Sequence, residues 1–286
     1  MEQLNNAGSQ QTLERNKRSK IIAFYFSKGG VGKSRLAILL SNYYAAIGKK
    51  VCVIDIDSST HSSTDYYNIE ENIEKARKSH NVAKLMFDTE NELDDFALTT
   101  NHENIFLVPS SRNLSSMRTM NENTFKKILS KPNSFDFIIL DCPPAYDNFA
   151  INAIRAADKT ISPCLQDNDS FGNAVSLFGD YQNEIEDKLN DWYLIVNGYN
   201  KQFADAVTGK QQEYISRYEE YFGNHLVPRE CWLPWTKDMN NIRDRGLCLS
   251  KTKIRGTVCN ENLFNAIKNL AECFVDEDKI EEPEKF

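Results

Sequence analysis

The stretch that most constrains the fold runs from residue 20 to residue 48, where a hydrophobic segment, a glycine-rich loop and a helical pattern follow one another. KIIAFYF (20–26) is β-branched and aromatic, which is typical of a buried strand. SKGGVGKS (27–34) follows at once, and RLAILLSNYYAAIG (35–48) has apolar residues at helical spacing, with Gly48 placed to end the helix. A strand, a glycine-rich turn and a helix in this order direct backbone N–H groups and a helix N-terminus at an anion. The sequence therefore predicts a phosphate-binding loop.

This loop departs from the common phosphate-binding pattern G-x-x-x-x-G-K-[ST]. Ser27 stands where the first glycine is expected, and a second lysine, Lys28, follows it. The glycines are expected to allow backbone angles and a close approach that side chains would block. Lys33 is placed to reach the β- and γ-phosphates of a nucleotide, and the Ser34 hydroxyl to bind Mg²⁺. The residues of this loop predicted to contact the nucleotide are Lys28, Gly29, Gly30, Val31, Gly32, Lys33, Ser34 and Arg35.

Further hydrophobic runs, separated by helical patterns, predict the rest of the fold. They are KVCVIDID (50–57), NIFLVPS (104–110), FDFIILD (135–141), KTISPCL (159–165), DWYLIVNGY (191–199) and HLVPRECWL (225–233). Near-continuous apolar runs of this kind are typical of parallel strands that are covered on both faces. We therefore predict an α/β fold, a mostly parallel twisted sheet flanked by helices on both faces.

Length and composition are consistent with one domain. We place it at residues 20–275, between a flexible N-terminal arm (1–19) and an acidic C-terminal tail (276–286). The seven cysteines include no C-x-x-C pair, which argues against a disulfide framework or a zinc site and fits a reducing cytoplasm. The sequence contains no run of about 18 apolar residues, so it predicts no membrane span.

Three aspartates stand at or just beyond the ends of predicted strands. Asp141 ends FDFIILD, where phosphate-loop enzymes place a carboxylate that holds Mg²⁺. The alternative is that Asp141 caps a turn, since Pro143 and Pro144 prevent a helix from starting at once. Asp55 and Asp57 would point to opposite faces if their strand continued, so we expect them to have different roles.

The motif K-G-G-V-G-K-S resembles the deviant Walker A motif of the ParA/MinD ATPases, a branch of the P-loop proteins. VIDIDSS resembles the second acidic motif of that family, and FIILDCPPAYDNFAINAIRAADKTISPCLQ resembles its Walker B and switch region. NIFLVPSSRNLSSM and LPWTKDMNNIRDRG resemble weaker landmarks. The resemblance covers residues 20–275 and implies the ParA/MinD fold, which is shared with the nitrogenase iron protein.

The resemblance also implies roles for single residues. Two subunits would sandwich two ATP molecules, with Lys33 acting on its own nucleotide and Lys28 crossing to that of the partner. Asp57 would orient the attacking water. The implied catalytic set is Lys28, Lys33 and Asp57, and the implied magnesium ligands are Ser34, Asp55 and Asp141. Here Ser58-Ser59-Thr60 replaces the usual Pro-Gln-Gly, so a helix N-cap or a turn is the alternative role for Asp57.

Recognition of the base and of DNA is less sharply indicated. In relatives, the positions of Asn197 and Pro234 lie near the adenine, although Asn197 could instead be a turn residue before Gly198. The segment 237–255 holds six Lys or Arg against two Asp in a chain of net charge −7. In partition-type relatives such residues bind DNA by neutralising phosphates, whereas a solvated face is the alternative. The candidates are Arg243, Arg245, Lys251, Lys253 and Arg255.

Taken together, the resemblance implies a cytoplasmic partition ATPase with weak intrinsic activity. Its cofactors would be ATP and Mg²⁺, and its partners a second copy of the chain, non-specific double-stranded DNA and a centromere-binding or cargo adaptor protein. A MinD-like membrane ATPase is an alternative, but it needs a basic amphipathic C-terminal helix, whereas this chain ends VDEDKIEEPEKF. A carrier like the nitrogenase iron protein is another, but Cys142 has no close cysteine in the sequence.

Overall fold

The computed structural model describes residues 18–60, 62–67, 78–112, 121–199, 209–236 and 260–274. In this part of the chain one sheet has the strand order β3-β4-β2-β5-β1-β6-β7-β8. All neighbouring strands are parallel except β3, which is antiparallel to β4. The predicted α/β fold with a mostly parallel sheet is therefore confirmed.

The described part of the chain has eight strands, of which six lie within the predicted hydrophobic runs, whereas the short strand over 98–99 was not predicted. They are β1 (Lys20–Phe24), β2 (Val51–Asp55), β3 (Leu98–Thr99), β4 (Ile105–Val108), β5 (Phe137–Asp141), β6 (Lys159–Cys164), β7 (Trp192–Tyr199) and β8 (Leu233–Pro234). Every residue of β2 and β5 is buried, as expected for central parallel strands with both faces covered. Both of these strands end on an aspartate, which places two carboxylates at the carboxyl edge of the sheet.

The prediction of a strand over 225–233 is wrong for most of its length. The segment forms two 3-10 turns, η3 (Gly223–His225) and η4 (Arg229–Cys231), before the two-residue strand β8. Pro228 lies between the turns, and a proline lacks the N–H group that a strand interior needs. Only an isolated bridge between Leu194 and Leu226 pairs the earlier part with the sheet.

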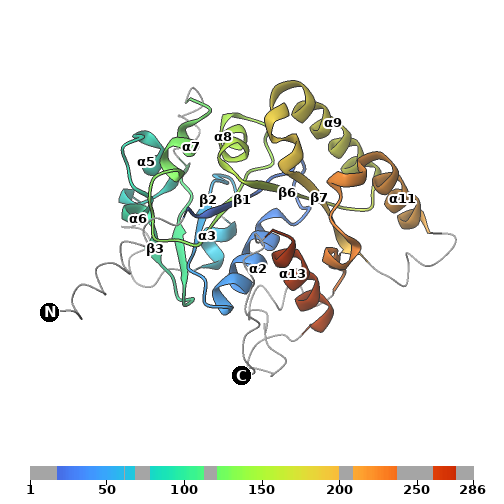
Figure 1. Ribbon diagram of the computed structural model, residues 1–286, viewed down its shortest axis with the longest axis horizontal. Coiled ribbons are helices and arrows are strands. Elements are labelled where there is room, and N and C mark those ends of the chain that lie inside the picture. Colours follow the sequence, from blue (N-terminus) through green and yellow to red (C-terminus); the bar gives the residue numbers. More distant parts are fainter. Residues whose placement is uncertain are drawn as a thin grey trace, which may run out of the picture.

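Helices cover both faces of the sheet (Figure 1). They are α2 (Lys33–Ala46), α3 (Ser62–Tyr66), α5 (Val82–Phe87), α6 (Leu93–Phe96), α7 (Thr124–Leu129), α8 (Asn148–Ala156), α9 (Asn168–Glu184), α11 (Lys210–Phe222) and α13 (Glu261–Phe274), with the 3-10 helix η2 (Glu186–Asp191) after α9. In Figure 1, α7, α8 and α9 lie on one side of the sheet, and α2 and α13 on the other. As predicted, α2 ends two residues before Gly48, whose φ of 80° suits glycine.

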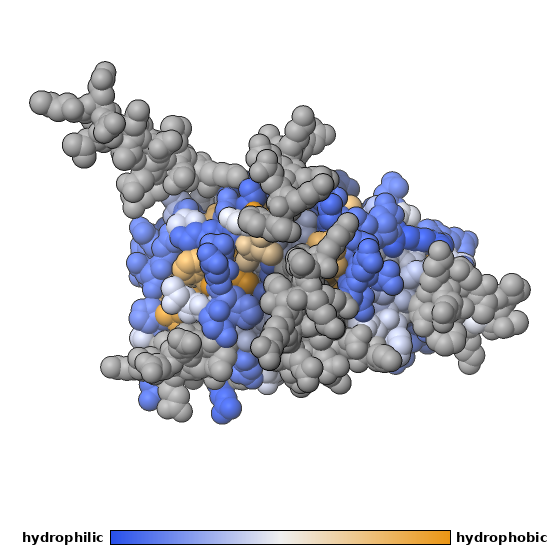
Figure 2. Space-filling view, turned by 90° about the horizontal axis from the view of Figure 1, so that it is seen from below, coloured by the Kyte–Doolittle hydropathy of each residue, from blue (hydrophilic) through white to orange (hydrophobic). Residues whose placement is uncertain are grey.

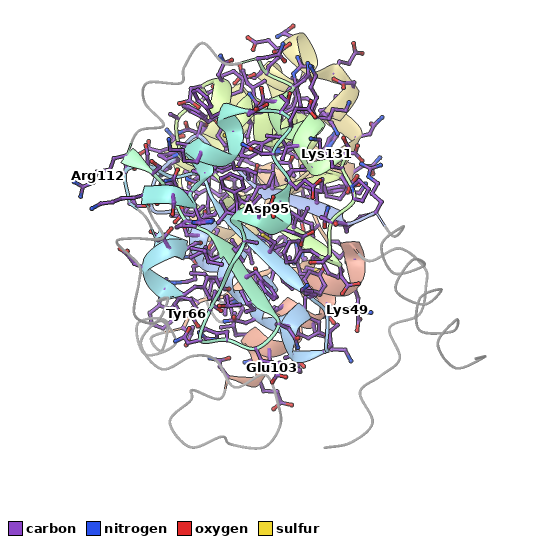
Figure 3. All side chains as sticks on the ribbon, turned by 90° about the vertical axis from the view of Figure 1, so that its left-hand side faces the viewer. Lys49, Tyr66, Asp95, Glu103, Arg112 and Lys131 are labelled. Carbon is purple, nitrogen blue, oxygen red and sulfur yellow. The ribbon has the colours of Figure 1, made fainter. Side chains whose placement is uncertain are left out.

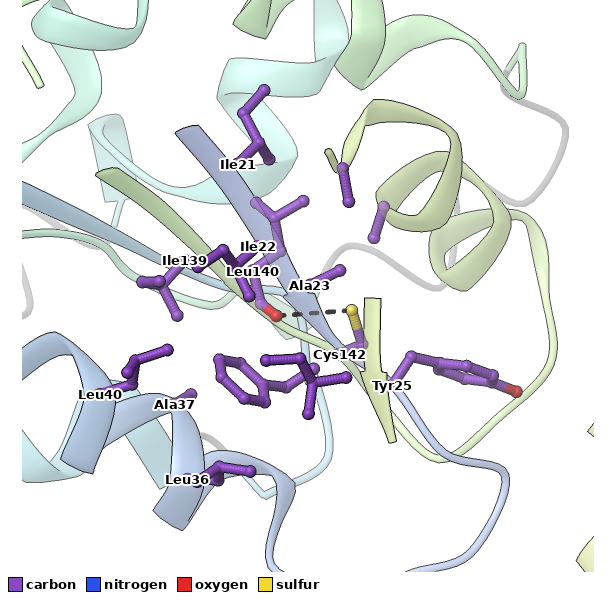
Figure 4. Close-up of a cluster of buried hydrophobic side chains, with 14 of the residues drawn as sticks. Ile21, Ile22, Ala23, Tyr25, Leu36, Ala37, Leu40, Ile139, Leu140 and Cys142 are labelled. Carbon is purple, nitrogen blue, oxygen red and sulfur yellow. Dashed lines mark hydrogen bonds between the residues drawn. The ribbon is translucent and has the colours of Figure 1, made fainter. Parts of the chain in front are cut away.

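The core lies between α2 and the central strands (Figure 4). Leu36, Ala37 and Leu40 of α2 are fully buried, as are Ile22 of β1 and Ile139 of β5. On the far side of β1, the buried Cys142 thiol donates to the Leu140 carbonyl oxygen at 3.7 Å. This packing holds α2, and therefore the loop before it, in a fixed position on the sheet.

Apart from a few buried groups at the carboxyl edge of the sheet, among them Lys33, Asp55 and Asp141, the described charged side chains lie mostly at the periphery of the molecule. Asp95, Glu103 and Arg112 are exposed on the side seen in Figure 3. Among the residues that Figure 2 shows in colour, hydrophilic ones predominate and surround a smaller hydrophobic area. None of the described helices has the length and apolar character that crossing a bilayer requires. The predicted arm and tail lie outside the described residues, apart from Arg18 and Ser19.

Candidate functional site

The glycine-rich loop joins β1 to α2 at the carboxyl edge of the sheet, where open α/β sheets bind their ligands. Gly32 is the N-cap of α2 with φ at 102°, and a Cβ atom there would lie 2.4 Å from Asn197 Nδ2. Gly30 has φ at 76°. Gly29 has neither a positive φ nor a neighbour within 4 Å of a Cβ. The need for glycine is therefore visible at Gly30 and Gly32 but not at Gly29 in this structure.

Lys33, the first residue of α2, points into the protein. Its side chain is buried, and Nζ donates a hydrogen bond of 3.0 Å to the Lys28 carbonyl oxygen. Burial lowers the pKa of Lys33, and the nearby Asp141 opposes this shift. The next residues, Ser34 and Arg35, lie half-buried in the first turn of the helix. The loop therefore folds back over the Lys33 side chain. A loop that binds an anion has the same curved shape.

Asp55 and Asp141 are register neighbours at the ends of β2 and β5, and both are fully buried. Asp55 accepts hydrogen bonds from the Thr64 amide (2.8 Å), the Thr64 hydroxyl (2.7 Å) and the Asp57 amide (3.1 Å). Asp141 Oδ2 accepts one from the Ser63 hydroxyl at 2.5 Å. Among the described residues, Asp141 Oδ1 is buried without any hydrogen-bond partner.

The protonation of these two carboxyls follows from their surroundings. Burial raises the pKa of Asp141 to about 6, although the hydroxyls of Ser63 and Ser34 favour its ionised form. Burial, together with the neighbouring Asp141 charge, raises the pKa of Asp55 well above its usual value. Two buried like charges side by side disfavour full ionisation, and a cation between them would remove that penalty.

Asp57 lies just beyond β2, and its carboxylate is enclosed by the residues that follow it. Oδ1 accepts hydrogen bonds from the Ser59 amide (2.8 Å), the Ser59 hydroxyl (2.5 Å) and the Thr60 amide (3.2 Å). Oδ2 accepts one from the Thr60 hydroxyl at 2.9 Å. Although burial opposes ionisation, these bonds from Ser59 and Thr60 lower the pKa of Asp57. The Ser-Ser-Thr replacement thus gives Asp57 a turn-capping role in this structure.

Lys28 turns in the opposite direction from Lys33, towards the turn between β6 and α9. Its Nζ lies 2.9 Å from Asp167 Oδ1 and 3.4 Å from the Ser170 hydroxyl. Asp167 is also the N-cap of α9, where it accepts the Ser170 amide at 2.7 Å. Burial opposes ionisation of Asp167, but the Ser170 amide and the Lys28 ammonium outweigh it and lower its pKa. The second lysine of the loop is therefore bound within its own chain.

Asn197 contacts the phosphate loop itself. Its Nδ2 donates to the Val31 carbonyl oxygen at 2.7 Å, while the main-chain carbonyl oxygen of Asn197 accepts the Gln166 side-chain amide at 2.7 Å. Pro234 lies on the neighbouring strand β8, and the Trp235 amide bonds to the Tyr199 carbonyl oxygen at 2.7 Å. Asn197 therefore supports the phosphate loop in this structure, and contact with a base would be a second role.

The residues at this edge fit a nucleotide with Mg²⁺. The unpartnered Asp141 Oδ1 and the Ser34 hydroxyl are oxygen donors of the kind that Mg²⁺ binds. Lys33 and the backbone N–H groups at the start of α2 would hold the phosphates. Asp55 fits less well as a direct ligand, because both of its oxygens already accept hydrogen bonds.

Sequence reasoning missed several residues of this site. Ser63 and Thr64 of α3 hold the two buried aspartates, and no motif singles them out. Asp167 had a usable signal, since it lies two residues beyond a predicted strand and has the character of an N-cap residue. The five predicted DNA-binding residues all lie in 237–259, outside the described residues.

Comparisons with known proteins show which family the chain belongs to. A family model described as an AAA domain matches residues 19–195, more than half of the chain. The chain is 28% identical over 227 residues to the sporulation initiation inhibitor protein Soj of Bacillus subtilis, covering 73% of this chain and 84% of that protein. It is 29% identical over 229 residues to the chromosome-partitioning ATPase Soj of Treponema pallidum, covering 73% and 83%.

The fold is also found among solved structures. A plasmid partition protein of Borrelia burgdorferi bound to AMPPNP aligns with a TM-score of 0.68 and 21% identity, covering 90% of this chain and 98% of that chain. This likeness concerns the fold, while the family match and the two Soj relatives concern the sequence as well. The chain therefore belongs to the ParA/MinD family of P-loop ATPases.

Proposed function

We propose that this protein is a ParA-type partition ATPase that forms a dimer only when ATP is bound. In that dimer, Lys28 of each subunit reaches the nucleotide of the other subunit. The dimer binds double-stranded DNA without sequence preference through the segment 237–255, and a centromere-binding or cargo adaptor protein stimulates its weak hydrolysis. The protein works in the cytoplasm, on the nucleoid when ATP is bound. The names of the Treponema pallidum relative, a chromosome-partitioning ATPase, and of the plasmid partition protein support the partition role in this proposal.

The observation that carries the proposal is the opposite placement of the two loop lysines. Lys33 is buried and directed towards the ends of the central strands, so it serves the nucleotide of its own chain. Lys28 retains 24% of its side-chain exposure, and its partner Asp167 retains 43%. An ion pair this exposed contributes at most about 1 kcal/mol. Lys28 can therefore exchange its partner for a phosphate of a second subunit at little cost.

The residues around the nucleotide have separate tasks in this proposal. Bound ATP with Mg²⁺ supplies the phosphoryl group that is transferred to water. Lys33 and the loop amides hold the phosphates, and Ser34 and Asp141 hold the metal. Asp57 orients the attacking water, for which it has to give up part of its bonding to Ser59 and Thr60. Release of that turn by a partner protein would accelerate hydrolysis.

The decisive experiment measures the oligomeric state against the bound nucleotide. Sedimentation velocity of the full chain should show a dimer with a non-hydrolysable ATP analogue and a monomer with ADP. Lys28→Ala should lose the dimer and still bind the nucleotide. Lys127→Ala, which removes an exposed lysine of α7, is the matched control and should behave as the unaltered protein. An ATP-dependent dimer that persists in Lys28→Ala would exclude the role of Lys28 across the interface.

Binding to DNA has its own test. Retention on non-specific double-stranded DNA should require the ATP analogue and should fall steeply as salt rises, because counterions are released when phosphates are neutralised. Exchange of Arg243 and Arg245 for Glu should lower retention and reduce the salt dependence, with nucleotide binding unchanged. Retention that is equal in ATP, ADP and nucleotide-free protein would contradict the proposal.

A further inference from the structure

Two cysteines that are distant in the sequence meet at the edge of the sheet. Cys231 ends η4 and Cys273 lies in the last turn of α13, 42 residues further along the chain. Their sulfur atoms are 3.4 Å apart. Cys231 is buried, whereas Cys273 is exposed to solvent. A pair of thiols with one accessible member is what an oxidant in solution can attack.

The packing around the two cysteines keeps them together. Leu270 and Ala271 of α13 are buried, and the Asn269 side-chain amide donates to the Glu230 carbonyl oxygen at 3.0 Å. This hydrogen bond connects the residue before Cys231 with the helix that carries Cys273. A disulfide has a sulfur–sulfur distance of about 2 Å, so the two sulfurs have to approach by little more than about 1 Å.

The other described cysteines differ from this pair. Cys52, Cys142 and Cys164 are fully buried, and burial raises the pKa of each thiol. Among the described cysteines, Cys231 and Cys273 alone have their sulfur atoms in contact. Reaction with an oxidant should therefore concentrate on the pair.

We propose that Cys231 and Cys273 form a reversible disulfide when the protein meets hydrogen peroxide. The Cys273 thiolate attacks one peroxide oxygen and breaks the O–O bond, which gives a sulfenic acid and a hydroxide that takes up the thiol proton as water. The Cys231 sulfur then attacks the Cys273 sulfur, and the sulfenic hydroxyl leaves with the Cys231 proton as a second water. Two thiols are oxidised and one peroxide is reduced to two waters. This inference does not depend on the proposed function.

Electrostatics indicates which thiol reacts first and with which oxidant. The hydrogen bond from Cys231 lowers the pKa of Cys273 to about 7, although partial burial and the carboxylates of Glu230 and Glu272 oppose the shift. The same hydrogen bond raises the pKa of Cys231. Cys273 is therefore the thiol that ionises. The two carboxylates repel an anionic oxidant such as oxidised glutathione, so an uncharged peroxide is the better reactant.

The bond would have a structural consequence beyond the two residues. It would close a loop that contains the whole segment 237–259. The disulfide would also attach this loop to α13, which carries Cys273. Helix α13 packs on α2, and the Tyr44 hydroxyl of α2 donates to the Ala271 carbonyl oxygen at 3.3 Å. Closing a loop of this length reduces the freedom of the unfolded chain, so the oxidised protein should unfold at a temperature roughly 5 °C higher.

The test uses the full chain with Cys248 and Cys259, which lie outside the described residues, both exchanged for serine. After treatment with a moderate excess of hydrogen peroxide, peptide mapping without reductant should show a linked pair of peptides that contain Cys231 and Cys273. Dithiothreitol should restore both thiols, and the upward shift of the melting temperature should vanish with it. Absence of the linked peptides while Cys273 becomes sulfinic acid would overturn the proposal, as would two thiols that remain free.

Single variants separate the two roles. Cys273→Ser, at an exposed position, should fold normally and show no peroxide-dependent change in melting temperature. Cys231→Ser should leave Cys273 without its partner, so that Cys273 proceeds to the sulfinic acid. If Cys231→Ser does not fold, Cys273→Ser decides alone, because a stabilisation by peroxide that survives in that variant would exclude the disulfide.

Discussion

Two carboxylate sites face the phosphate loop, and their characters are opposite. At the ends of the central strands, Asp141 is fully buried, its pKa is raised, and one of its oxygens has no hydrogen-bond partner among the described residues. At the turn between β6 and α9, Asp167 is half-exposed, its pKa is lowered, and it bonds to both Ser170 and Lys28. Asp141 keeps one oxygen without a hydrogen-bond partner, whereas Asp167 is fully bonded within the chain.

This difference in burial and hydrogen bonding indicates which of the two sites binds a ligand. A buried polar atom without a partner is costly, and it persists where something else binds it. Asp167 needs no ligand, because it already bonds to Lys28 and to the Ser170 amide, and it keeps the Lys28 side chain on the outer side of the loop. In this view the inner site binds the nucleotide and its metal, and the outer site sets how readily the second lysine leaves.

The largest expected effect is at the inner lysine. Lys33→Ala should weaken binding of a fluorescent ATP analogue at least about 30-fold, because removing one partner of a buried charged contact costs about 2–5 kcal/mol. Lys28→Ala, measured beside it, should keep most of the affinity, since Lys28 is bound to Asp167 on the outer side of the loop. Equal losses in the two variants would remove the distinction between inner and outer lysine.

A smaller effect is expected when the pH of metal-free protein is varied. The pKa of Asp141 is raised from its usual value of 3.8 to about 6, so between these values the folded chain holds a proton that the unfolded chain has lost. The stability contributed by that proton is present below pH 4 and is lost as the pH rises through 6. We expect a decrease of about 1–3 kcal/mol in the free energy of unfolding over this range.

Urea unfolding at several pH values measures this slope. Asp141→Asn should flatten it, because the amide does not titrate, and the variant should be more stable than the unaltered protein at pH 7 without metal. An unchanged slope in Asp141→Asn would show that Asp141 is not the group that titrates over this range.

The smallest effect concerns the outer site. Asp167→Asn keeps a good N-cap for α9 but removes the charge that holds Lys28. Sedimentation equilibrium with the ATP analogue should show a dimer that is tighter by up to about fivefold for each of the two Lys28–Asp167 pairs that it releases, in line with at most about 1 kcal/mol for an exposed ion pair. Asp88→Asn, an exposed charge change elsewhere, should leave the dimer as it was. A weaker dimer in Asp167→Asn would mean that Asp167 assists Lys28 instead of competing for it.

Much of the fold could be predicted because burial imposes continuous apolar runs on parallel strands. The runs that became β1, β2, β4, β5, β6 and β7 were found within two residues of their ends. The short edge strand β3 and the small helices α3, α5 and α6 were missed, because two to six residues carry too little periodicity to predict an element. The strand expected over 225–233 failed where Pro228 and the two 3-10 turns interrupt pairing.

The amino-acid sequence by itself determined the phosphate loop and the aspartates at the strand ends, because those features depend on a few neighbouring residues and on the parallel order of the strands. Only the tertiary structure decided what holds these groups. Lys28 meets Asp167 across 139 residues of chain, Ser63 meets Asp141 across 78, and Cys231 meets Cys273 across 42. Such contacts arise from the packing of elements that are remote in the sequence, so no local pattern records them.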